Sequence, residues 1–459
     1  MFPGKCIAHV FHLLLFLTVT KMPELVQSAF CCVNNPAGVS SPKETFLSRK
    51  PSIFHDDDAA IQSIIYDKPP GATFTPASDI FKIHWSGVTV GEAKQRIRNQ
   101  PGHVLVKATH ISILPLARAH LDFSRTGGID TGAKDLGLPA TAIGDEAAGE
   151  CVTRVIASNA EGYEVEDLLY IPGAVFDYRV VRADGQNLQS KRPPTKLPPG
   201  VDPTVYLAAF TVPGGVTAYL ASEHSNVAKV LAAEQQARAA SAETRGVPAP
   251  TDSDSPPVVL VSSAAGAVGL SIGQLYKMKG YFVIGSTSTR AKAERLTTEF
   301  GFDAAVAYQE RDVGSEGSFE EGLRAAASEA NGNHNGLIDF FVDNVGGEQL
   351  DTALRLMKPQ GKVLTIGAIS EMERYSTGNV RGCKEYLRIP ARELLWGGFM
   401  VSAHLQLVPE AISKLTQYVA EGKLKTAATV KRGTLETWFS ADDEMHKSQG
   451  FGRTILELM

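Results

Sequence analysis

The spacing of hydrophobic and polar positions divides most of the chain into two blocks. From about residue 60 to 205, β-branched and aromatic runs such as IQSIIY, FKIHW and HVLVKATHISIL are separated by Pro and Gly, as in short strands. From Val258 onward, strand-like and helix-like patterns alternate, starting with VVLV and then AVGLSIGQLYKMKG. The first block predicts a mostly β, barrel-like domain. The second predicts a doubly wound α/β domain, in which a parallel sheet carries helices on both faces.

The segment between the two blocks changes character along its length. ASEHSNVAKVLAAEQQARAASAETR has the composition of a helix, whereas Thr244 to Pro257 is rich in Pro, Ser and Asp. A stretch of the second kind cannot bury a core. We therefore predict a surface insertion at about residues 233–257, and its role stays open.

The first 55 residues differ from both blocks. IAHVFHLLLFLTVT, after Lys5, has the length of a signal-peptide core and is too short to span a bilayer. The Ser- and Pro-rich stretch CCVNNPAGVSSPKETFLSRKPS follows and resembles a transit peptide. We expect a targeting or disordered extension at 1–55, with a plastid as its destination. A cytoplasmic location, the secretory pathway and a true start at Met22 are open alternatives.

Composition narrows the class of protein. The 459 residues suffice for two or three domains, and a net charge of −5 argues against a nucleic-acid partner, which would favour a basic surface. The five cysteines form no paired CxxC motifs, so we expect neither a disulfide framework nor a structural zinc site. Beyond the N-terminal stretch, no segment is apolar for long enough to cross a membrane, so we expect no span in the mature chain.

The turn after the first α/β strand carries the clearest chemical signal. Its letters AAGAVG match the dinucleotide motif GxGxxG with alanine in first place, at Ala264, Ala265, Gly266, Ala267 and Gly269. Small residues let backbone amides approach a pyrophosphate, and the following helix directs its positive end toward it. The strand–turn–helix context predicts dinucleotide binding. A turn that serves packing alone is the alternative.

About twenty residues later, an NAD site would place Asp or Glu on the adenosine ribose. This chain instead has GSTSTRAK, with Ser288, Arg290 and Lys292. Hydroxyls and cations suit a 2′-phosphate, which a carboxylate would repel. The pattern therefore predicts NADPH, unless Arg290 and Lys292 are only the solvated first turn of a helix.

These motifs, together with YDKPPG, VLVKATHISILPLAR, VPGGVTAYLA, FGFDAAVAY, FVDNVGG, GKVLTIGAIS and EGKL, resemble the zinc-independent medium-chain dehydrogenases/reductases. Within them, the chain is most similar to the prostaglandin reductase and alkenal double-bond reductase group. The resemblance implies a GroES-like β-barrel domain (56–205), a Rossmann domain (206–385) and a C-terminal segment that returns to the barrel (386–459). It also implies NADPH-dependent reduction of the C=C bond of α,β-unsaturated ketones or aldehydes, without metal, by a homodimer.

The resemblance assigns further cofactor contacts. Lys292 and Tyr308 match residues that meet the 2′-phosphate, and Asn344 matches a cofactor-contacting asparagine. Two backbone segments match those beside the nicotinamide. They are Gly367, Ala368, Ile369 and Ser370, and then Phe399, Met400 and Val401, which by pattern alone form an apolar strand.

The departures from the family bear on the substrate. Met372 stands where the family has a tyrosine that faces the substrate carbonyl, and Tyr375 follows three residues later as the candidate catalytic donor. Gly450 replaces the asparagine of a C-terminal Asn-x-Gly-Lys motif, and Leu114 and Leu116 replace polar and aromatic residues. The cofactor ribose hydroxyl and water are other possible proton sources. A quinone reductase and a non-catalytic NADPH-binding or scaffold protein stay open as alternatives.

Overall fold

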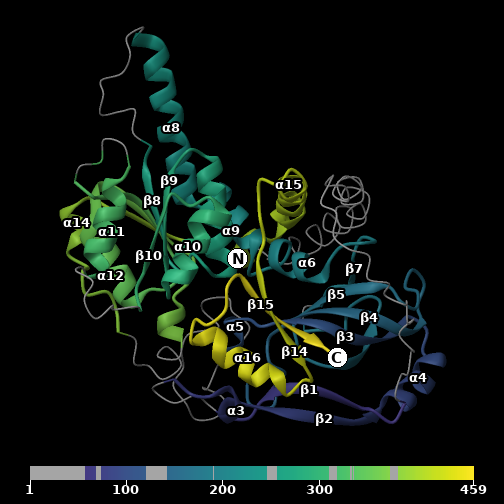
Figure 1. Ribbon diagram of the computed structural model, residues 1–459. Helices are drawn as coiled ribbons and strands as arrows, with labels where there is room; N and C mark the ends of the chain where they lie inside the picture. Colours follow the sequence, from purple (N-terminus) through teal and green to yellow (C-terminus); the bar gives the residue numbers. More distant parts are fainter. Residues whose placement is uncertain are drawn as a thin grey trace, which may run out of the picture.

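The computed structural model of the protein describes residues 57–68, 74–119, 142–189, 191–245, 256–309, 318–330, 333, 335–372 and 381–459. The predicted targeting segment and Tyr375 lie outside these residues. The described chain forms a mostly antiparallel β domain and a parallel α/β domain, which lie beside each other in Figure 1.

The β domain is built on a seven-stranded sheet. Its order is β14-β15-β3-β4-β5-β7, with β6 also paired to β3. A separate hairpin, β1-β2, lies next to it. The strands are β1 (Ala60–Tyr66), β2 (Phe81–Thr89), β3 (His103–Ser112), β4 (Glu150–Asn159), β5 (Leu168–Pro172), β6 (Tyr178–Arg182), β7 (Thr195–Lys196), β14 (Ala428–Gly433) and β15 (Arg453–Leu458). The helices are α3 (Ala77–Ile80), α4 (Val90–Arg98), α5 (Leu116–Ala119), α6 (Pro203–Ala209) and α16 (Thr437–His446).

Strand β3 is buried on both faces. Val104 and Val106 belong to the main core of this domain, whereas Leu105 packs against Val90 and Ile97 of α4. Side chains alternate between the faces of a strand, so the run VLV supplies two cores at once. The apolar run in the sequence therefore marks a strand that is covered on both sides.

The α/β domain contains a six-stranded sheet whose pairs are all parallel, in the order β10-β9-β8-β11-β12-β13. The strands are β8 (Val258–Val261), β9 (Phe282–Thr287), β10 (Ala304–Ala307), β11 (Ile338–Asp343), β12 (Met357–Thr365) and β13 (Leu395–Gly398). The strand order reverses between β8 and β11. In doubly wound sheets, ligands bind at this reversal, outside the carboxyl ends of the strands.

Helices cover both faces of this sheet (Figure 1). In β8, Val259 and Val261 face the core formed with α7, α9 and α15, whereas Val258 and Leu260 face the core formed with α11 and α12. The predicted fold class, a β domain combined with a doubly wound parallel sheet, is confirmed. The helices are α7 (Gly215–His224), α8 (Asn226–Arg245), α9 (Ala267–Met278), α10 (Arg290–Phe300), α11 (Phe319–Ser328), α12 (Gly347–Leu356), α14 (Arg388–Ala391) and α15 (Val408–Ala420), with 3-10 turns η2 (Ile369–Glu371) and η3 (Val401–Leu407).

Helix α8 extends away from the body of the molecule (Figure 1). Its first turns are anchored: Val227 and Leu231 are buried in the core, and Glu234 forms an ion pair with Lys362 of β12 at 2.6 Å. The predicted insertion begins within this helix, and residues 246–255 of the insertion lie outside the described part of the chain.

The C-terminal part of the chain returns to the β domain by two strands. The family resemblance predicts this return at residue 386. In the structure, β13 still pairs with β12 in the parallel sheet, and β14 is the first strand of this part to join the sheet of the β domain. Phe399–Val401 is not a strand, contrary to the prediction. The Phe399 amide makes the last hydrogen bond to β12, at the Thr365 carbonyl (2.9 Å), because β12 ends at Thr365. The 3-10 turn η3 then begins at Val401.

Candidate cofactor site

The turn between β8 and α9 has the shape that the small residues predict. Ser263 adopts a positive φ of 50°, and a Cβ on Gly269 would lie 2.2 Å from the Ser263 carbonyl oxygen. The N-cap residue of α9 is Gly266, which has no side chain to cap the helix, so the N-terminus of α9 can face an anion. Only glycine fits at 269. This cradle can hold a pyrophosphate.

The next strand in the sheet fixes the other side of the cradle. Asn344, directly after β11, donates its side-chain amide to the Ser262 carbonyl and its backbone amide to the Ser262 hydroxyl, both at 2.8 Å. Asp343 accepts hydrogen bonds from Ser262, Val345 and Gly346 through one carboxyl oxygen. Burial raises the pKa of Asp343 to about 6. The predicted cofactor residue Asn344 thus lies beside the turn, where it joins β11 to β8.

The segment from Gly367 to Ser370 follows β12 and lies against the same loop. The Gly367 amide donates to the Asp343 carbonyl at 3.2 Å, and a Cβ on Gly367 would lie 3.3 Å from the Asn344 carbonyl oxygen. The Ser370 hydroxyl donates to the Val345 carbonyl at 2.7 Å. Ala368 and Ile369 lie between them at the start of η2.

Beyond β13, Phe399 stacks on the His404 ring with centroids 4.9 Å apart, and the Met400 side chain is exposed. Both backbone segments predicted beside the nicotinamide therefore leave the carboxyl ends of neighbouring strands.

The predicted 2′-phosphate residues are brought together at the ends of β9 and β10. The Lys292 ammonium donates to the Ser288 hydroxyl at 3.0 Å and to the Ser448 carbonyl, and burial lowers the pKa of Lys292. The Tyr308 hydroxyl donates to the Ser448 hydroxyl at 3.4 Å. Arg290 is exposed on the first turn of α10. A cavity of about 590 Å³ opens beside Lys292, large enough for a phosphate and its ribose.

The cavity is also lined by Arg295, Lys447 and Ser448, which the sequence motifs alone do not indicate. Arg295 lies three residues after Lys292 on α10, so helical periodicity could have indicated it. Lys447 and Ser448 follow α16, and no local pattern relates them to α10.

The chain that follows α16 also contacts the dinucleotide turn. The Gly452 amide donates to the Ala265 carbonyl at 2.7 Å. Gly452 has a φ of 72°, and a Cβ there would lie 2.0 Å from the Ala427 carbonyl oxygen, so this position requires glycine. The turn of the α/β domain is thus in direct contact with the strand that returns to the β domain.

Next to Gly452, Arg453 at the start of β15 is buried. Its guanidinium donates to the Thr211 hydroxyl at 2.8 Å and to the Leu207 carbonyl at 3.2 Å, and it lies 3.4 Å from the Glu150 carboxylate. Tyr170 donates to the same carboxylate at 2.6 Å. Burial raises the pKa of Glu150. These contacts connect β15 with β4, β5 and α6.

The other chemistry-bearing residues lie apart from one another. Among the described residues, no three His, Cys, Asp or Glu side chains come together as a metal site. Burial raises the pKa of Cys151 to about 12, and its thiol donates to the Ala174 carbonyl, so it is not a thiolate nucleophile. Leu114 is buried, and Met372 is partly buried. No described helix is long and apolar enough to cross a membrane.

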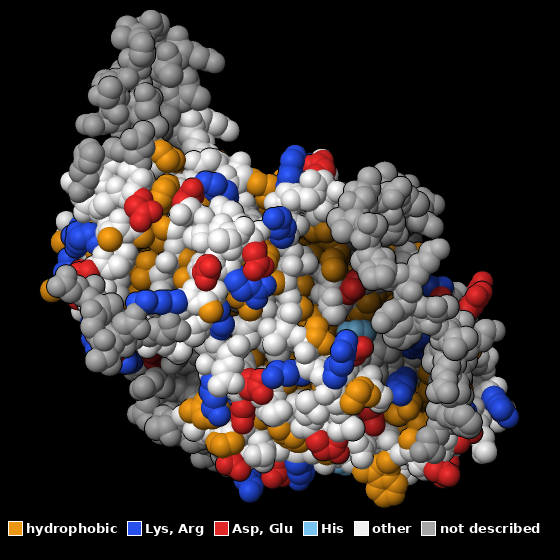
Figure 2. Space-filling model, in the orientation of Figure 1, with side chains coloured by type: hydrophobic (Ala, Val, Ile, Leu, Met, Phe, Trp, Pro, Cys, Tyr) orange, Lys and Arg blue, Asp and Glu red, His pale blue; other side chains and the backbone are white. Residues whose placement is uncertain are grey.

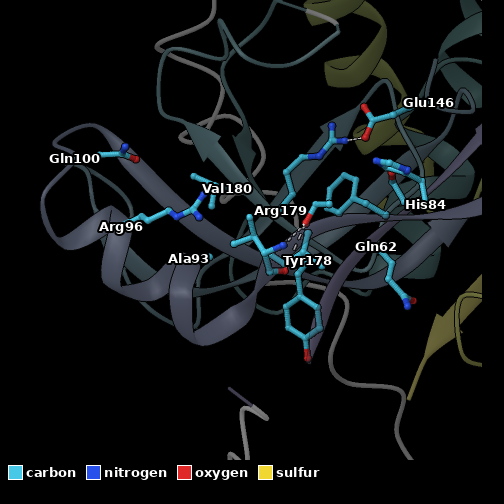
Figure 3. A pocket seen from close by; sticks show the side chains of 14 residues that line it. Gln62, His84, Ala93, Arg96, Gln100, Glu146, Tyr178, Arg179 and Val180 are labelled. Atoms are coloured by element: carbon cyan, nitrogen blue, oxygen red, sulfur yellow. Dashed lines mark hydrogen bonds and ion pairs between the residues drawn. The ribbon is translucent and has the colours of Figure 1, made fainter. Parts of the chain in front are cut away.

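A second cavity, of about 400 Å³, lies in the β domain between the β1-β2 hairpin, α4 and β6. Figure 3 shows Arg179 extended toward Glu146, with which it forms an ion pair, and the Arg179 guanidinium lies 4.5 Å from the Phe176 ring centroid. This cavity shares no lining residue with the cavity beside Lys292. On the face drawn in Figure 2, acidic and basic side chains are interspersed, without the broad basic area typical of a nucleic-acid interface.

The chain is similar in sequence to several known proteins. Residues 267–404 match the family model of zinc-binding dehydrogenases. The NADP-dependent oxidoreductase RED1 of Cochliobolus heterostrophus is 25% identical over 360 residues, which cover 78% of this chain and 88% of that protein. Prostaglandin reductase 1 of Bos taurus is 34% identical over 200 residues, which cover 43% of this chain and 56% of that protein. The 2-alkenal reductase (NADP(+)-dependent) of Nicotiana tabacum is 31% identical over 198 residues, 43% of this chain and 53% of that protein.

The fold of most of the chain is similar to that of solved structures. CurA of Vibrio vulnificus, in complex with NADPH, superimposes with a TM-score of 0.63 at 19% identity, over 87% of this chain and 99% of that chain. The family model and the relatives support the predicted resemblance to the zinc-independent medium-chain dehydrogenases/reductases, and within them to the alkenal and prostaglandin reductase group.

Proposed function

We propose that this protein reduces the C=C bond of α,β-unsaturated ketones or aldehydes with NADPH, without a metal. The observation that carries the proposal is the site beside Lys292, where a cation and hydroxyls replace the carboxylate of an NAD site. The relatives named (+)-pulegone reductase, 2-alkenal reductase and prostaglandin reductase 1 support this substrate class.

The cofactor is NADPH. The RED1 and 2-alkenal reductase relatives are named as NADP-dependent, and the similar CurA structure contains NADPH. The residues of this chain fit that cofactor: Gly269 leaves room for a pyrophosphate, and Lys292 lies at the edge of the cavity that suits a 2′-phosphate.

When bound, NADPH supplies a hydride from its nicotinamide ring. In the proposed reaction, the β-carbon of the substrate gains this hydride, the C=C electron pair moves toward the carbonyl oxygen, and the α-carbon then takes up a proton. The backbone segments at 367–370 and 399–401 follow the carboxyl ends of β12 and β13, and they would hold the nicotinamide next to the substrate. A hydrogen-bond donor at the carbonyl oxygen lowers the barrier because negative charge develops there.

We propose Tyr375 as that donor, with the ribose hydroxyl and water as the other proton sources. Replacing Tyr375 by Phe should lower kcat with an enone by about 100-fold, the usual effect of losing one such donor. The exposed Tyr386 provides a matched control, and Tyr386→Phe should leave kcat unchanged. Full activity of Tyr375→Phe would assign the donor role to another group.

A quinone reductase is the second candidate. It would share the cofactor site beside Lys292 and transfer electrons to a quinone. A non-catalytic NADPH-binding or scaffold protein is the third, and Met372 and Gly450, which depart from the family pattern, are the features in its favour.

An acceptor panel distinguishes the three. NADPH oxidation would be followed at 340 nm with a medium-chain 2-enal, an enone and a quinone, with NADH in parallel, and the products identified by mass spectrometry. The proposal predicts saturated carbonyl products with NADPH preferred. Turnover of the quinone alone would support a quinone reductase, and NADPH binding without oxidation would support a non-catalytic protein.

We also propose a homodimer that is targeted to a plastid. β13 is the last strand of the parallel sheet in the described chain and carries the exposed Leu395, so its edge is available to another copy. Light scattering should give twice the monomer mass, and a monomeric mass would refute the dimer.

Residues 1–55 fused to a fluorescent protein should direct that protein to plastids. A fusion protein that stays in the cytoplasm would refute the plastid proposal.

A further inference from the structure

The cavity beside Lys292 is lined by both domains. Lys292 and Arg295 come from α10 of the α/β domain, and Lys447 and Ser448 come from the chain that returns to the β domain. No Asp or Glu is among the described residues that line this cavity. Arg295 is paired with Glu299 on α10 at 2.9 Å, whereas Lys292 and Lys447 have no carboxylate in the lining. These two cations make the cavity a site for an anion.

Ser448 is the central residue of this site. Its carbonyl oxygen accepts hydrogen bonds from the Lys292 ammonium and from the Ser288 hydroxyl, the latter at 3.1 Å. Its hydroxyl accepts one from the Tyr308 hydroxyl at 3.4 Å. Three residues predicted at the 2′-phosphate therefore share a single partner, and that partner lies on the other domain.

Lys447 is a cation with no carboxylate partner among the described side chains. Its ammonium lies 4.8 Å from the Phe74 ring centroid, and the residue is exposed at the cavity wall. A lysine ammonium is carried on a flexible stem of four carbons, so the Lys447 ammonium can move from the Phe74 ring to a nearby phosphate.

We propose that Lys447 and Ser448 complete the 2′-phosphate site, so that the phosphate of NADPH is bound from both domains at once. The inference rests on the proposed function for its cofactor. A phosphate is a stronger partner for Lys292 than the neutral Ser448 carbonyl, because the attraction between two opposite full charges adds to the hydrogen bond. The phosphate therefore replaces this carbonyl as the partner of Lys292, and the Ser448 hydroxyl and the Lys447 ammonium donate to it.

This arrangement couples the 2′-phosphate to the pyrophosphate turn. Gly452, four residues after Ser448, donates to the Ala265 carbonyl of the turn. A ligand that bears the 2′-phosphate thus engages the C-terminal chain beside both parts of the cofactor site. A ligand without it engages only the turn.

The test is calorimetric binding of adenosine 2′,5′-bisphosphate and of 5′-AMP, which lacks the 2′-phosphate, to the full chain. Lys447→Gln should raise the Kd of the bisphosphate about three- to fivefold, the range for one exposed ion pair, and leave the Kd of 5′-AMP unchanged. Ser448→Gly should act in the same direction. Glycine accepts the positive φ of 57° at this position, so the fold is retained. The exposed Lys414 of α15 gives the matched control, and Lys414→Gln should bind both ligands like the wild type.

The difference between Lys447→Gln and the wild type should shrink as salt is added, because an exposed ion pair is screened. If both variants bind the bisphosphate as the wild type does while Lys292→Ala loses affinity, the inference is wrong and the cofactor assignment stands. If the wild type itself binds the bisphosphate no better than 5′-AMP, the cofactor assignment fails and this inference fails with it.

Discussion

At the residue scale, a buried ion pair connects the C-terminal chain to the rest of the β domain. Arg453 of β15 and Glu150 of β4 are each 3% exposed, and Arg453 also bonds to α6 and to Thr211 after it. Such a pair need not add stability relative to apolar residues, but the loss of one partner leaves the other charge buried alone.

Arg453→Met should therefore lower the free energy of unfolding by about 3 kcal/mol at pH 7. The loss should be smaller near pH 5, because burial already raises the pKa of Glu150, and protonation removes the unpaired charge. Urea unfolding at the two pH values measures this. The exposed Arg432–Glu457 pair is the matched control, and Arg432→Met should cost less than about 1 kcal/mol. Equal losses in the two variants would show that Arg453 is not a critical contact.

A second residue-scale prediction concerns Asp343, whose folded pKa of about 6 lies above the ordinary value of 3.8. The folded protein binds this proton more tightly than the unfolded chain. Its contribution to stability is thus complete below pH 4 and is lost as the pH rises through 6. Asp343→Asn keeps the oxygen that accepts from Ser262, Val345 and Gly346 and carries no charge.

The variant should therefore gain stability relative to the wild type between pH 4 and pH 7, by about 3 kcal/mol in total. Thermal unfolding midpoints of both proteins across this pH range provide the measurement. A constant difference between them would mean that Asp343 does not titrate as burial predicts.

At the element scale, α9 is held against the sheet by a glycine. A Cβ on Gly273 would lie 2.1 Å from the Phe302 ring, so the helix packs directly on that side chain. Close packing of α9 keeps its N-terminus directed at the cofactor turn. This glycine, within a helix, therefore has a packing role.

Gly273→Ala should destabilise the protein by about 1–3 kcal/mol through overpacking. In a Phe302→Leu background, the same substitution should cost less, because leucine lacks the ring atoms that clash. A double-mutant cycle by urea unfolding measures this coupling. Additive losses would show that the helix and Phe302 do not constrain each other.

The elements of the α/β domain could be predicted from sequence because each is marked locally. The expected strand at Val258–Val261 is β8, since a buried parallel strand is an unbroken apolar run that ends at a turn. Phe399–Val401 was predicted wrongly as a strand. β13 ends where β12 has no further backbone groups to pair with it. The apolar sequence of 399–401 carries no information about this pairing.

At the scale of the whole molecule, the site is formed where distant parts of the chain meet. Motif spacing predicted the turn and Lys292, and the family resemblance assigned Tyr308 and Asn344. All of them lie near the carboxyl ends of strands in one domain. Ser448 is 156 residues from Lys292, and Gly452 reaches Ala265 from the other domain. These contacts depend on how the domains pack, and sequence periodicity reports only which face of an element is buried.

Hydride transfer from NADPH to the β-carbon of an enone or enal is tested most directly with NADPH that carries two deuterium atoms at C4 of the nicotinamide, so that transfer from either face delivers deuterium. A medium-chain 2-enal and an enone are the substrates, and the products are analysed by NMR. We predict one deuterium at the β-carbon of a saturated carbonyl compound. Deuterium on the former carbonyl carbon of an unsaturated alcohol, or no labelled product from either substrate, would contradict the account.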